Sequence, residues 1–73
     1  DDTSAAAVAG ADESAVAHFL AARIRFTDIA RLLQQTLDAH HPTSRADLTL
    51  DDLLAAEQWG RDFVDHAVVA GVS

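Results

Sequence analysis

The chain has 73 residues and a formal net charge of −7, from ten Asp, two Glu, five Arg and no Lys. Its few basic side chains cannot neutralise a run of phosphates, so we expect no binding to nucleic acid or to an anionic membrane surface. No apolar run approaches the roughly 20 residues that span a bilayer, and the acidic N-terminus is unlike a signal peptide. The composition predicts one small domain with the cytoplasm as its default location.

Stability is expected to be marginal in a domain of this size. The sequence contains no Cys, so no disulfide restricts the unfolded chain. In such small domains the free energy of apolar burial and the conformational entropy of ordering the chain nearly cancel. We therefore expect the chain to self-associate or to bind a protein partner, and its acidity is compatible with a basic partner.

The first helix is predicted in the N-terminal third. Residues 1–11 form an Ala-rich N-terminal segment, which we interpret either as partly helical after Ser4 or as a frayed tail. The helix itself is predicted over residues 12–24, with Asp12 as its N-cap. Helical spacing places four apolar residues on its buried stripe: Val16, Phe19, Leu20 and Ile24.

The second helix is predicted over residues 28–40, with Thr27 as its cap. It ends before Pro42, because the residue that precedes a proline is disfavoured in a helix. Residues 43–48 form the most convincing loop of the sequence. The buried face of this helix is predicted to consist of Ile29, Leu32, Leu33 and Leu37.

The third helix is predicted over residues 50–70. Thr49 and Asp52 fit a capping box at its start, and Gly71 fits its C-terminal end. Gly60 lies inside the apolar stripe, which predicts close approach to another helix at that point. The stripe consists of Leu53, Ala56, Gly60, Phe63, Val64, Ala67 and Val68.

These elements predict an all-α fold, a small three- to four-helix bundle over residues 12–70, followed by a tail over residues 71–73. Two large apolar residues, Trp59 and Leu54, flank the stripe of the third helix. They are the candidate interface residues, since Trp is enriched at the energetic centres of protein interfaces. Trp59 equally fits a role in covering the edge of the core, and the sequence leaves both interpretations open.

The histidines do not predict a metal centre. His40 and His41 are adjacent, so on a helix they would point about 100° apart and could not chelate one ion. Asp62 and His66 are four residues apart, which is more typical of a surface ion pair than of half a metal site. Without Cys to complete a site, we expect neither a metal ion nor a cofactor.

Ser14 is the one candidate acceptor of a covalent group. The sequence around it faintly resembles the phosphopantetheine site of an acyl carrier protein, and the length and acidity of the chain fit a carrier. The carrier motif has Asp directly before its Ser, whereas Glu13 stands there in this chain. A local helix cap is the simpler interpretation of Ser14.

Two segments carry a resemblance to a known family: Ile24-Arg25-Phe26-Thr27-Asp28-Ile29-Ala30 and Asp51-Asp52-Leu53-Leu54-Ala55-Ala56-Glu57-Gln58-Trp59. Both resemble the C-terminal helical domain of 1-deoxy-D-xylulose 5-phosphate reductoisomerase, an NADPH- and metal-dependent enzyme of isoprenoid precursor synthesis. The resemblance covers about Val8 to Val68. The family's Asn-Ala-Ala-Asn-Glu segment is replaced by Ala9-Gly10-Ala11-Asp12-Glu13, so both Asn are lost.

The resemblance implies a small helix bundle that follows a catalytic domain. It also implies that the metal ligands, the substrate site and the NADPH-binding fold lie upstream, so the isolated chain is expected to catalyse nothing. Three roles remain open. The chain is a structural or protein-binding module, a fragment that supports the active site of the intact enzyme, or a small carrier or leader-type module that presents residues 68–73 to a modifying enzyme.

Overall fold

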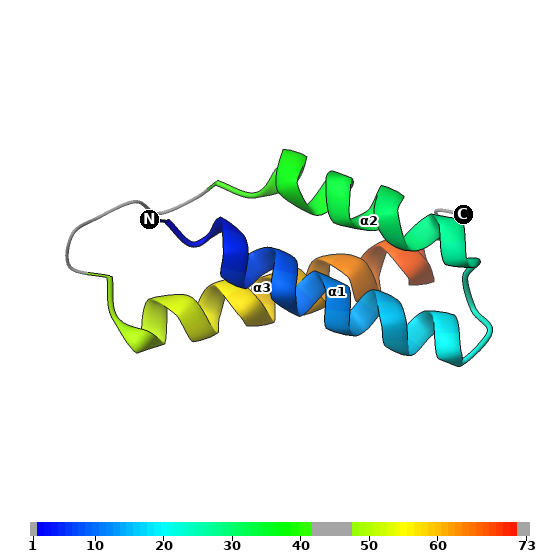
Figure 1. The fold of residues 1–73 in the computed structure, drawn as a ribbon, viewed down its shortest axis with the longest axis horizontal. Coiled ribbons are helices and arrows are strands. Elements are labelled where there is room, and N and C mark those ends of the chain that lie inside the picture. Colours follow the sequence, from blue (N-terminus) through cyan, green and yellow to red (C-terminus); the bar gives the residue numbers. More distant parts are fainter. Residues whose placement is uncertain (1, 42–47, 72–73) are drawn as a thin grey trace.

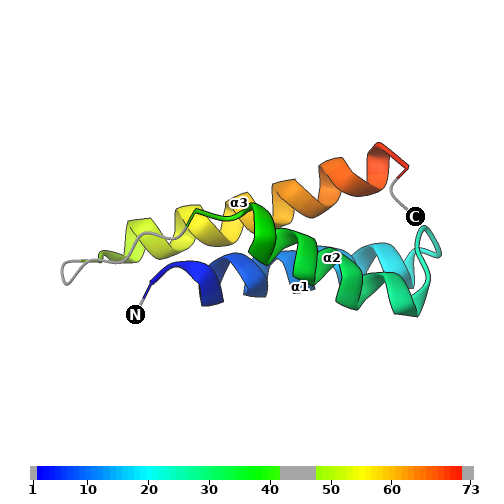
Figure 2. The same ribbon diagram turned by 90° about the horizontal axis from the view of Figure 1, so that it is seen from above.

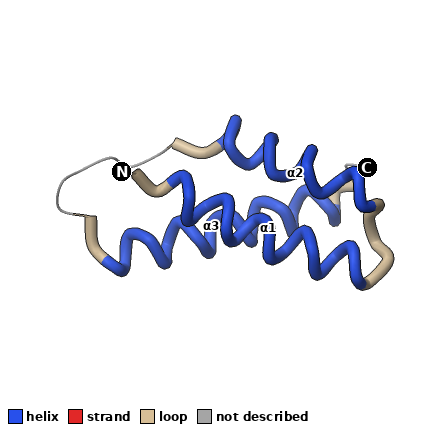
Figure 3. The backbone as a smooth tube through the Cα atoms, viewed as in Figure 1, coloured by secondary structure: helices blue, strands red, loops and turns tan. Residues whose placement is uncertain are grey.

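The computed structural model describes residues 2–41 and 48–71, which form three α-helices. Helix α1 spans Ser4–Leu20, α2 spans Phe26–Ala39 and α3 spans Leu50–Val69. The chain runs along the long axis three times, so α1 and α3 are parallel and α2 is antiparallel to both (Figure 1). No strand occurs in the described ranges (Figure 3). The predicted all-α bundle is confirmed.

Helix α1 is the centre of the bundle, because α2 and α3 both pack on it and barely touch each other. The molecule is elongated, with extents of 40 × 19 × 17 Å. Seen from above, α1 and α3 lie close together near the start of α1 and draw apart toward its end (Figure 2). The backbones of α1 and α3 are therefore close at one end of the bundle and farther apart at the other, here called the open end.

Two glycines allow the close crossing of α1 and α3. A Cβ atom on Gly60 would collide with the backbone carbonyl of Ala7, as predicted for a close approach of helices. A Cβ atom on Gly10 would likewise collide with the carbonyl of Glu57, a contact that the sequence did not predict. Glycine is needed at both positions because each faces backbone, which cannot rotate away as a side chain can.

The predicted bounds and buried face of the first helix are wrong. Helix α1 begins at Ser4 and ends at Leu20, so Asp12 is an exposed mid-helix residue and not an N-cap. Leu20 is 77% exposed and Val16 is also exposed. Ile24, in the turn after the helix, is buried as expected, and Phe19 is partly buried against the core. The face that packs on α3 consists of small residues, whose short side chains permit the crossing: Ala7, Gly10, Ala11, Ser14 and Ala15.

Helix α2 begins two residues earlier than predicted, and Asp28 caps it in place of Thr27. The Asp28 carboxylate is buried and accepts a hydrogen bond from the backbone N–H of Arg25 at 2.8 Å. Its other oxygen accepts one from the Arg31 guanidinium at 3.1 Å. Leu37, expected on the buried face, is half exposed, and the neighbouring Thr36 is buried instead with its hydroxyl donating to the Leu32 carbonyl.

Helix α3 follows the prediction closely in its bounds and caps, but Leu53, expected on the buried stripe, is exposed because it lies in the first turn, before the crossing with α1. The Asp52 N–H donates to the Thr49 hydroxyl at 3.2 Å, and the Thr49 N–H donates to the Asp52 carboxylate at 3.0 Å, so the capping box is confirmed. Gly71 follows the helix with a φ of 79°, the left-handed conformation that ends many helices. The predicted loop over residues 43–48 lies outside the described residues except for Leu48.

The core is thin and the apolar surface is extensive. The largest fully buried side chains are Leu32, Val64 and Thr36. No helix in the described part of the chain is both long and apolar enough to cross a membrane. Large apolar side chains are instead exposed near both ends of the bundle: Leu20, Phe26 and Val69 at the end of α1, the start of α2 and the end of α3, and Leu50, Leu53 and Leu54 at the start of α3.

Candidate functional site

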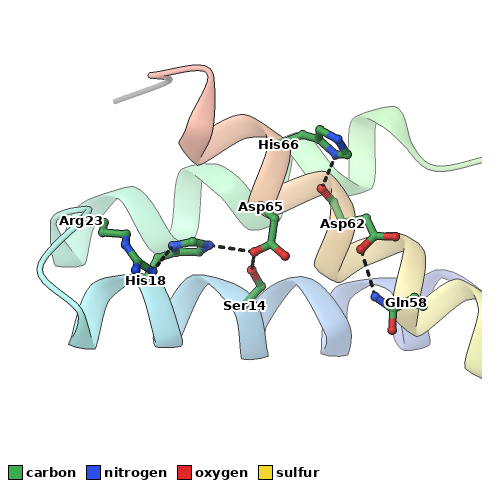
Figure 4. Close-up of polar contacts among 7 residues, drawn as sticks. All are labelled: Ser14, His18, Arg23, Gln58, Asp62, Asp65 and His66. Carbon is green, nitrogen blue, oxygen red and sulfur yellow. Dashed lines mark hydrogen bonds and ion pairs between the residues drawn. The ribbon is translucent and has the colours of Figure 1, made fainter.

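A polar cluster joins α1 to α3 at the open end of the bundle (Figure 4). The Ser14 hydroxyl donates to the Asp65 carboxylate at 2.7 Å, and His18 Nε2 lies 2.8 Å from the same carboxylate oxygen. The Arg23 guanidinium donates to His18 Nδ1 at 3.3 Å. These four side chains are hereafter called the Asp65 cluster, and two of them, Ser14 and His18, link α1 to α3 through one carboxylate.

Local structure brings three of the four side chains of the cluster together. Ser14 and His18 are four residues apart on α1, so their side chains point from the same face. Ala22, with a φ of 61°, turns the chain out of the helix. This turn lets the Arg23 N–H donate to the His18 carbonyl at 3.0 Å, which keeps the Arg23 side chain next to the imidazole.

The hydrogen bonds keep Asp65 ionised. The Ser14 hydroxyl lowers the pKa of Asp65 most, and the hydrogen bond from His18 lowers it further. Both donors stabilise the charged carboxylate more than its protonated form. Asp65 is therefore an acceptor at neutral pH, and Ser14 and His18 both donate to it.

The geometry does not resemble a catalytic triad. In a triad the base accepts the proton of the nucleophile, and a third group orients the base. Here Ser14 donates to the carboxylate and not to His18, and its side chain is buried, with the residue 7% exposed. The predicted cap role of Ser14 is also wrong, since it lies inside α1. A buried, hydrogen-bonded hydroxyl is a poor acceptor for a carrier group.

Arg61 forms a second link between α1 and α3 beside the Asp65 cluster. Its Nε donates to Glu13 at 2.8 Å, and its Nη2 lies 3.3 Å from Glu57. The hydrogen bond to Glu13 is the main cause of the raised pKa of Arg61. An open groove of about 310 Å³ runs between the two links.

The remaining polar residues of α3 do not form a metal centre. His66 contacts Asp62 through the backbone carbonyl at 2.8 Å, and the Asp62 carboxylate accepts from Gln58 at 3.0 Å (Figure 4). The expected ion pair between Asp62 and His66 is therefore replaced by two separate hydrogen bonds. Across residues 2–41 and 48–71, no three His, Asp or Glu side chains lie close enough together to hold a metal ion.

The two candidate interface residues lie in different environments. Trp59 is half buried: its ring stacks on Phe63 with centroids 5.3 Å apart and meets the His40 ring at 4.9 Å. Leu54 is 51% exposed and lies near Leu50 and Leu53 at the start of α3. Neither Trp59 nor Leu54 is part of the Asp65 cluster.

Sequence reasoning missed the Asp65 cluster. The spacing of Ser14 and His18 on one helical face is visible in the sequence. Asp65, however, is 47 residues beyond His18, and only the parallel packing of α3 on α1 selects it among the ten aspartates. No local pattern distinguishes it from an ordinary exposed carboxylate.

Comparison with known proteins identifies the origin of the fold. The profile of the DXP reductoisomerase C-terminal domain family matches residues 1–63. The 1-deoxy-D-xylulose 5-phosphate reductoisomerase of Geotalea daltonii is 50% identical over 52 residues, 71% of this chain and 13% of the relative. That of Thermomicrobium roseum is 48% identical over 58 residues, 80% of this chain and 15% of the relative.

The reductoisomerase of Synechococcus sp. strain CC9311 is similar along nearly the whole chain, being 39% identical over 69 residues, 94% of this chain and 17% of the relative. The chain thus spans less than a fifth of the length of these curated relatives. No solved structure matches it. The match over residues 1–63 and these identities show that the chain belongs to the family of DXP reductoisomerase C-terminal domains.

Proposed function

We propose that the chain is a non-catalytic helical module that packs against another protein surface. The observation that carries this proposal is the imbalance between its core and its surface. Among the residues that the structure describes, two large apolar side chains, Leu32 and Val64, are fully buried, and eight are exposed. The exposed ones are Val16, Leu20, Phe26, Leu37, Leu50, Leu53, Leu54 and Val69.

A protein partner fits this surface better than other ligands. The net charge of −7 disfavours nucleic acid and anionic membranes, whereas apolar residues with a polar rim are typical of protein contacts. We assign the main contact surface for the protein partner to Leu54 and its neighbours Leu50 and Leu53. Trp59 is the second candidate contact residue of α3, although its ring stacks on Phe63 and meets the ring of His40. The proposed location is the cytoplasm.

A second role is favoured by the small share of each relative's length that this chain matches. Since the chain matches 13 to 17% of the length of proteins named reductoisomerases, it fits a piece of such an enzyme that supports the active site from outside. In that role its exposed apolar residues contact the larger part of the same protein. The Asp65 cluster has no nucleophile and base in contact, which supports a non-catalytic role. The carrier alternative gains no support, because Ser14 is buried.

Sedimentation velocity over a hundredfold range of concentration tests the self-associating form of the proposal. We expect the average mass to rise with concentration, and Leu54→Ser to reduce that rise. Val69→Ser, at the opposite end of the bundle, is the matched control and should leave the association unchanged. A monomer at every concentration would exclude self-association and leave the support role, which calls for binding of the chain to a reductoisomerase that lacks this domain.

A further inference from the structure

We propose that His18 is a proton-sensitive connector between α1, the turn after it and α3. In its neutral form His18 accepts a hydrogen bond from Arg23 and donates one to Asp65. Its protonation breaks the contact with Arg23 and preserves the contact with Asp65. The inference is independent of the proposed packing role, because it depends only on contacts within the chain.

The partners of His18 fix which ring nitrogen carries the proton. A guanidinium can only donate, so Nδ1, which faces Arg23 at 3.3 Å, is an acceptor. In a neutral imidazole the other nitrogen then carries the hydrogen. Nε2 lies 2.8 Å from the ionised Asp65 carboxylate, which can only accept. Neutral His18 is therefore the Nε2–H tautomer.

His66 provides a contrast on the neighbouring helix. Its Nδ1 lies 2.8 Å from the backbone carbonyl oxygen of Asp62, which can only accept (Figure 4). Nδ1 must therefore carry the hydrogen, and neutral His66 is the Nδ1–H tautomer. The two histidines should differ in tautomer although both lie on helices at the same end of the bundle.

Protonation changes the two sides of His18 in opposite directions. Both ring nitrogens of an imidazolium donate, so Nδ1–H and the Arg23 guanidinium would face each other as two donors of like charge. That contact is lost. The contact between Nε2–H and Asp65 becomes a charge-assisted hydrogen bond and strengthens.

The other charged groups around His18 leave Arg23 as the partner that moves. From α3, Asp65 attracts the imidazolium, His66 lies near Asp65, and Arg61 is engaged by the carboxylates of Glu13 and Glu57. The turn contributes Arg23, which is exposed. Beyond it, Arg25 and Asp28 at the start of α2 line a neighbouring groove with Arg23.

Release of Arg23 would change the surface of the open end. An open groove of about 750 Å³ is lined there by His18, Arg23, Asp65, Val68 and Val69. While His18 is neutral, the hydrogen bond from the Arg23 guanidinium to His18 Nδ1 keeps the guanidinium at this groove. With His18 protonated, the guanidinium swings into solvent, and the imidazolium remains beside Asp65 together with the Ser14 hydroxyl.

Long-range ¹H–¹⁵N spectra of the intact, uniformly labelled chain test the inference. At pH 8 we expect the Nε2–H pattern for His18 and the Nδ1–H pattern for His66. Between pH 8 and pH 5 the side-chain signals of Arg23 should shift in step with those of His18, whereas those of Arg25 should not follow. An Nδ1–H pattern for His18, or Arg23 signals that ignore its titration, would overturn the proposal.

His18→Gln separates the connector from a general effect of pH. Glutamine keeps a polar side chain near Asp65 and does not titrate, so the Arg23 signals should become independent of pH between 5 and 8. Persistence of the same pH-dependent shift in this variant would assign it to another group and refute the role of His18. If the variant does not fold, the tautomers and the coupled titration in the unmodified chain still decide.

Discussion

Gly10 on α1 and Gly60 on α3 form a reciprocal contact, in which each lies where a Cβ atom would strike the backbone of the other helix. Gly10 faces Glu57, one turn before Gly60, and Gly60 faces Ala7, one turn before Gly10. The two parallel helices therefore approach each other backbone to backbone on both sides of one crossing (Figure 1). This crossing determines the distance between the helices more directly than the few large side chains of the core.

Replacing either glycine by alanine should destabilise the fold. Alanine gains about 1 kcal/mol in helix propensity. Overpacking costs about 1 to 3 kcal/mol and sometimes more, and here the obstacle is backbone, so we expect a net loss of about 2 kcal/mol or more. Urea denaturation of Gly10→Ala and Gly60→Ala measures this loss in the free energy of unfolding. A rise in the free energy of unfolding for Gly60→Ala would show that the helices are not in close contact there.

The double variant gives a sharper test of the crossing. Once the helices have moved apart to admit one Cβ atom, the second costs less. The combined loss should therefore be smaller than the sum of the single losses. Ala55→Gly, at an exposed position of α3, is a control for propensity alone and should cost about 1 kcal/mol.

Trp59 and Leu54 should respond differently to truncation. Trp59 stacks on Phe63 and contacts His40, so Trp59→Ala should lower the free energy of unfolding of the monomer by about 2 kcal/mol or more. Leu54 is half exposed, so Leu54→Ala should change it by less than about 0.5 kcal/mol. Thermal melts at low protein concentration measure both effects, and equal losses would place Leu54 in the core.

Acid should destabilise the fold through Asp65 and Asp28. Hydrogen bonds hold the pKa of both carboxyls below the usual range, from Ser14 to Asp65 and from the Arg25 backbone to Asp28. A depressed pKa adds stability that is fully present above the unfolded value of about 3.9 and is lost as the pH falls through the folded value.

The urea midpoint should therefore fall steeply below about pH 4. Asp65→Asn should make that fall shallower and lower the midpoint at pH 7. Asp12→Asn, at an exposed position of α1, is the matched control and should change neither. A midpoint that is the same at pH 3 and pH 7 would mean that these hydrogen bonds do not stabilise the fold.

The isolated chain should not convert 1-deoxy-D-xylulose 5-phosphate when NADPH and Mg²⁺ or Mn²⁺ are supplied. It spans 13 to 17% of its reductoisomerase relatives, and the Asp65 cluster lacks a nucleophile next to a base. Substrate-dependent loss of NADPH absorbance measures turnover, with an intact reductoisomerase as the positive control. Turnover by the pure chain would contradict the non-catalytic assignment.

The sequence predicted the parts of the fold that have strong local signals. Thr49 and Asp52 identified the start of α3, and the apolar stripe identified the role of Gly60. The buried face of α1 was missed because Ala and Gly carry little hydrophobic signal, whereas Val16 and Leu20 carry much and are exposed. Hydrophobic periodicity places large residues on the buried face, but only small residues fit the crossing of α1 and α3.

Only the part of the candidate site that lies on α1 could be predicted from the sequence. Ser14 and His18 share a helical face, which the spacing reveals. Their partner Asp65 is brought to them by the parallel packing of α3, a tertiary relationship with no local trace. The N-cap of α2 was misplaced by two residues for a different reason. Thr27 is a better cap by residue type than Arg25, which stands at the N-cap, and the Asp28 carboxylate caps the helix from inside its first turn.

The tight crossing has a mechanical consequence. With the backbones fixed against each other at Gly10 and Gly60, α1 and α3 can change their relative angle only by turning about that point. His18 lies two helical turns farther along α1, about 12 Å from the pivot. A rotation of a few degrees at the glycines therefore displaces the open end by several tenths of an ångström. Such a displacement is large enough to lengthen a hydrogen bond, while the crossing itself hardly changes.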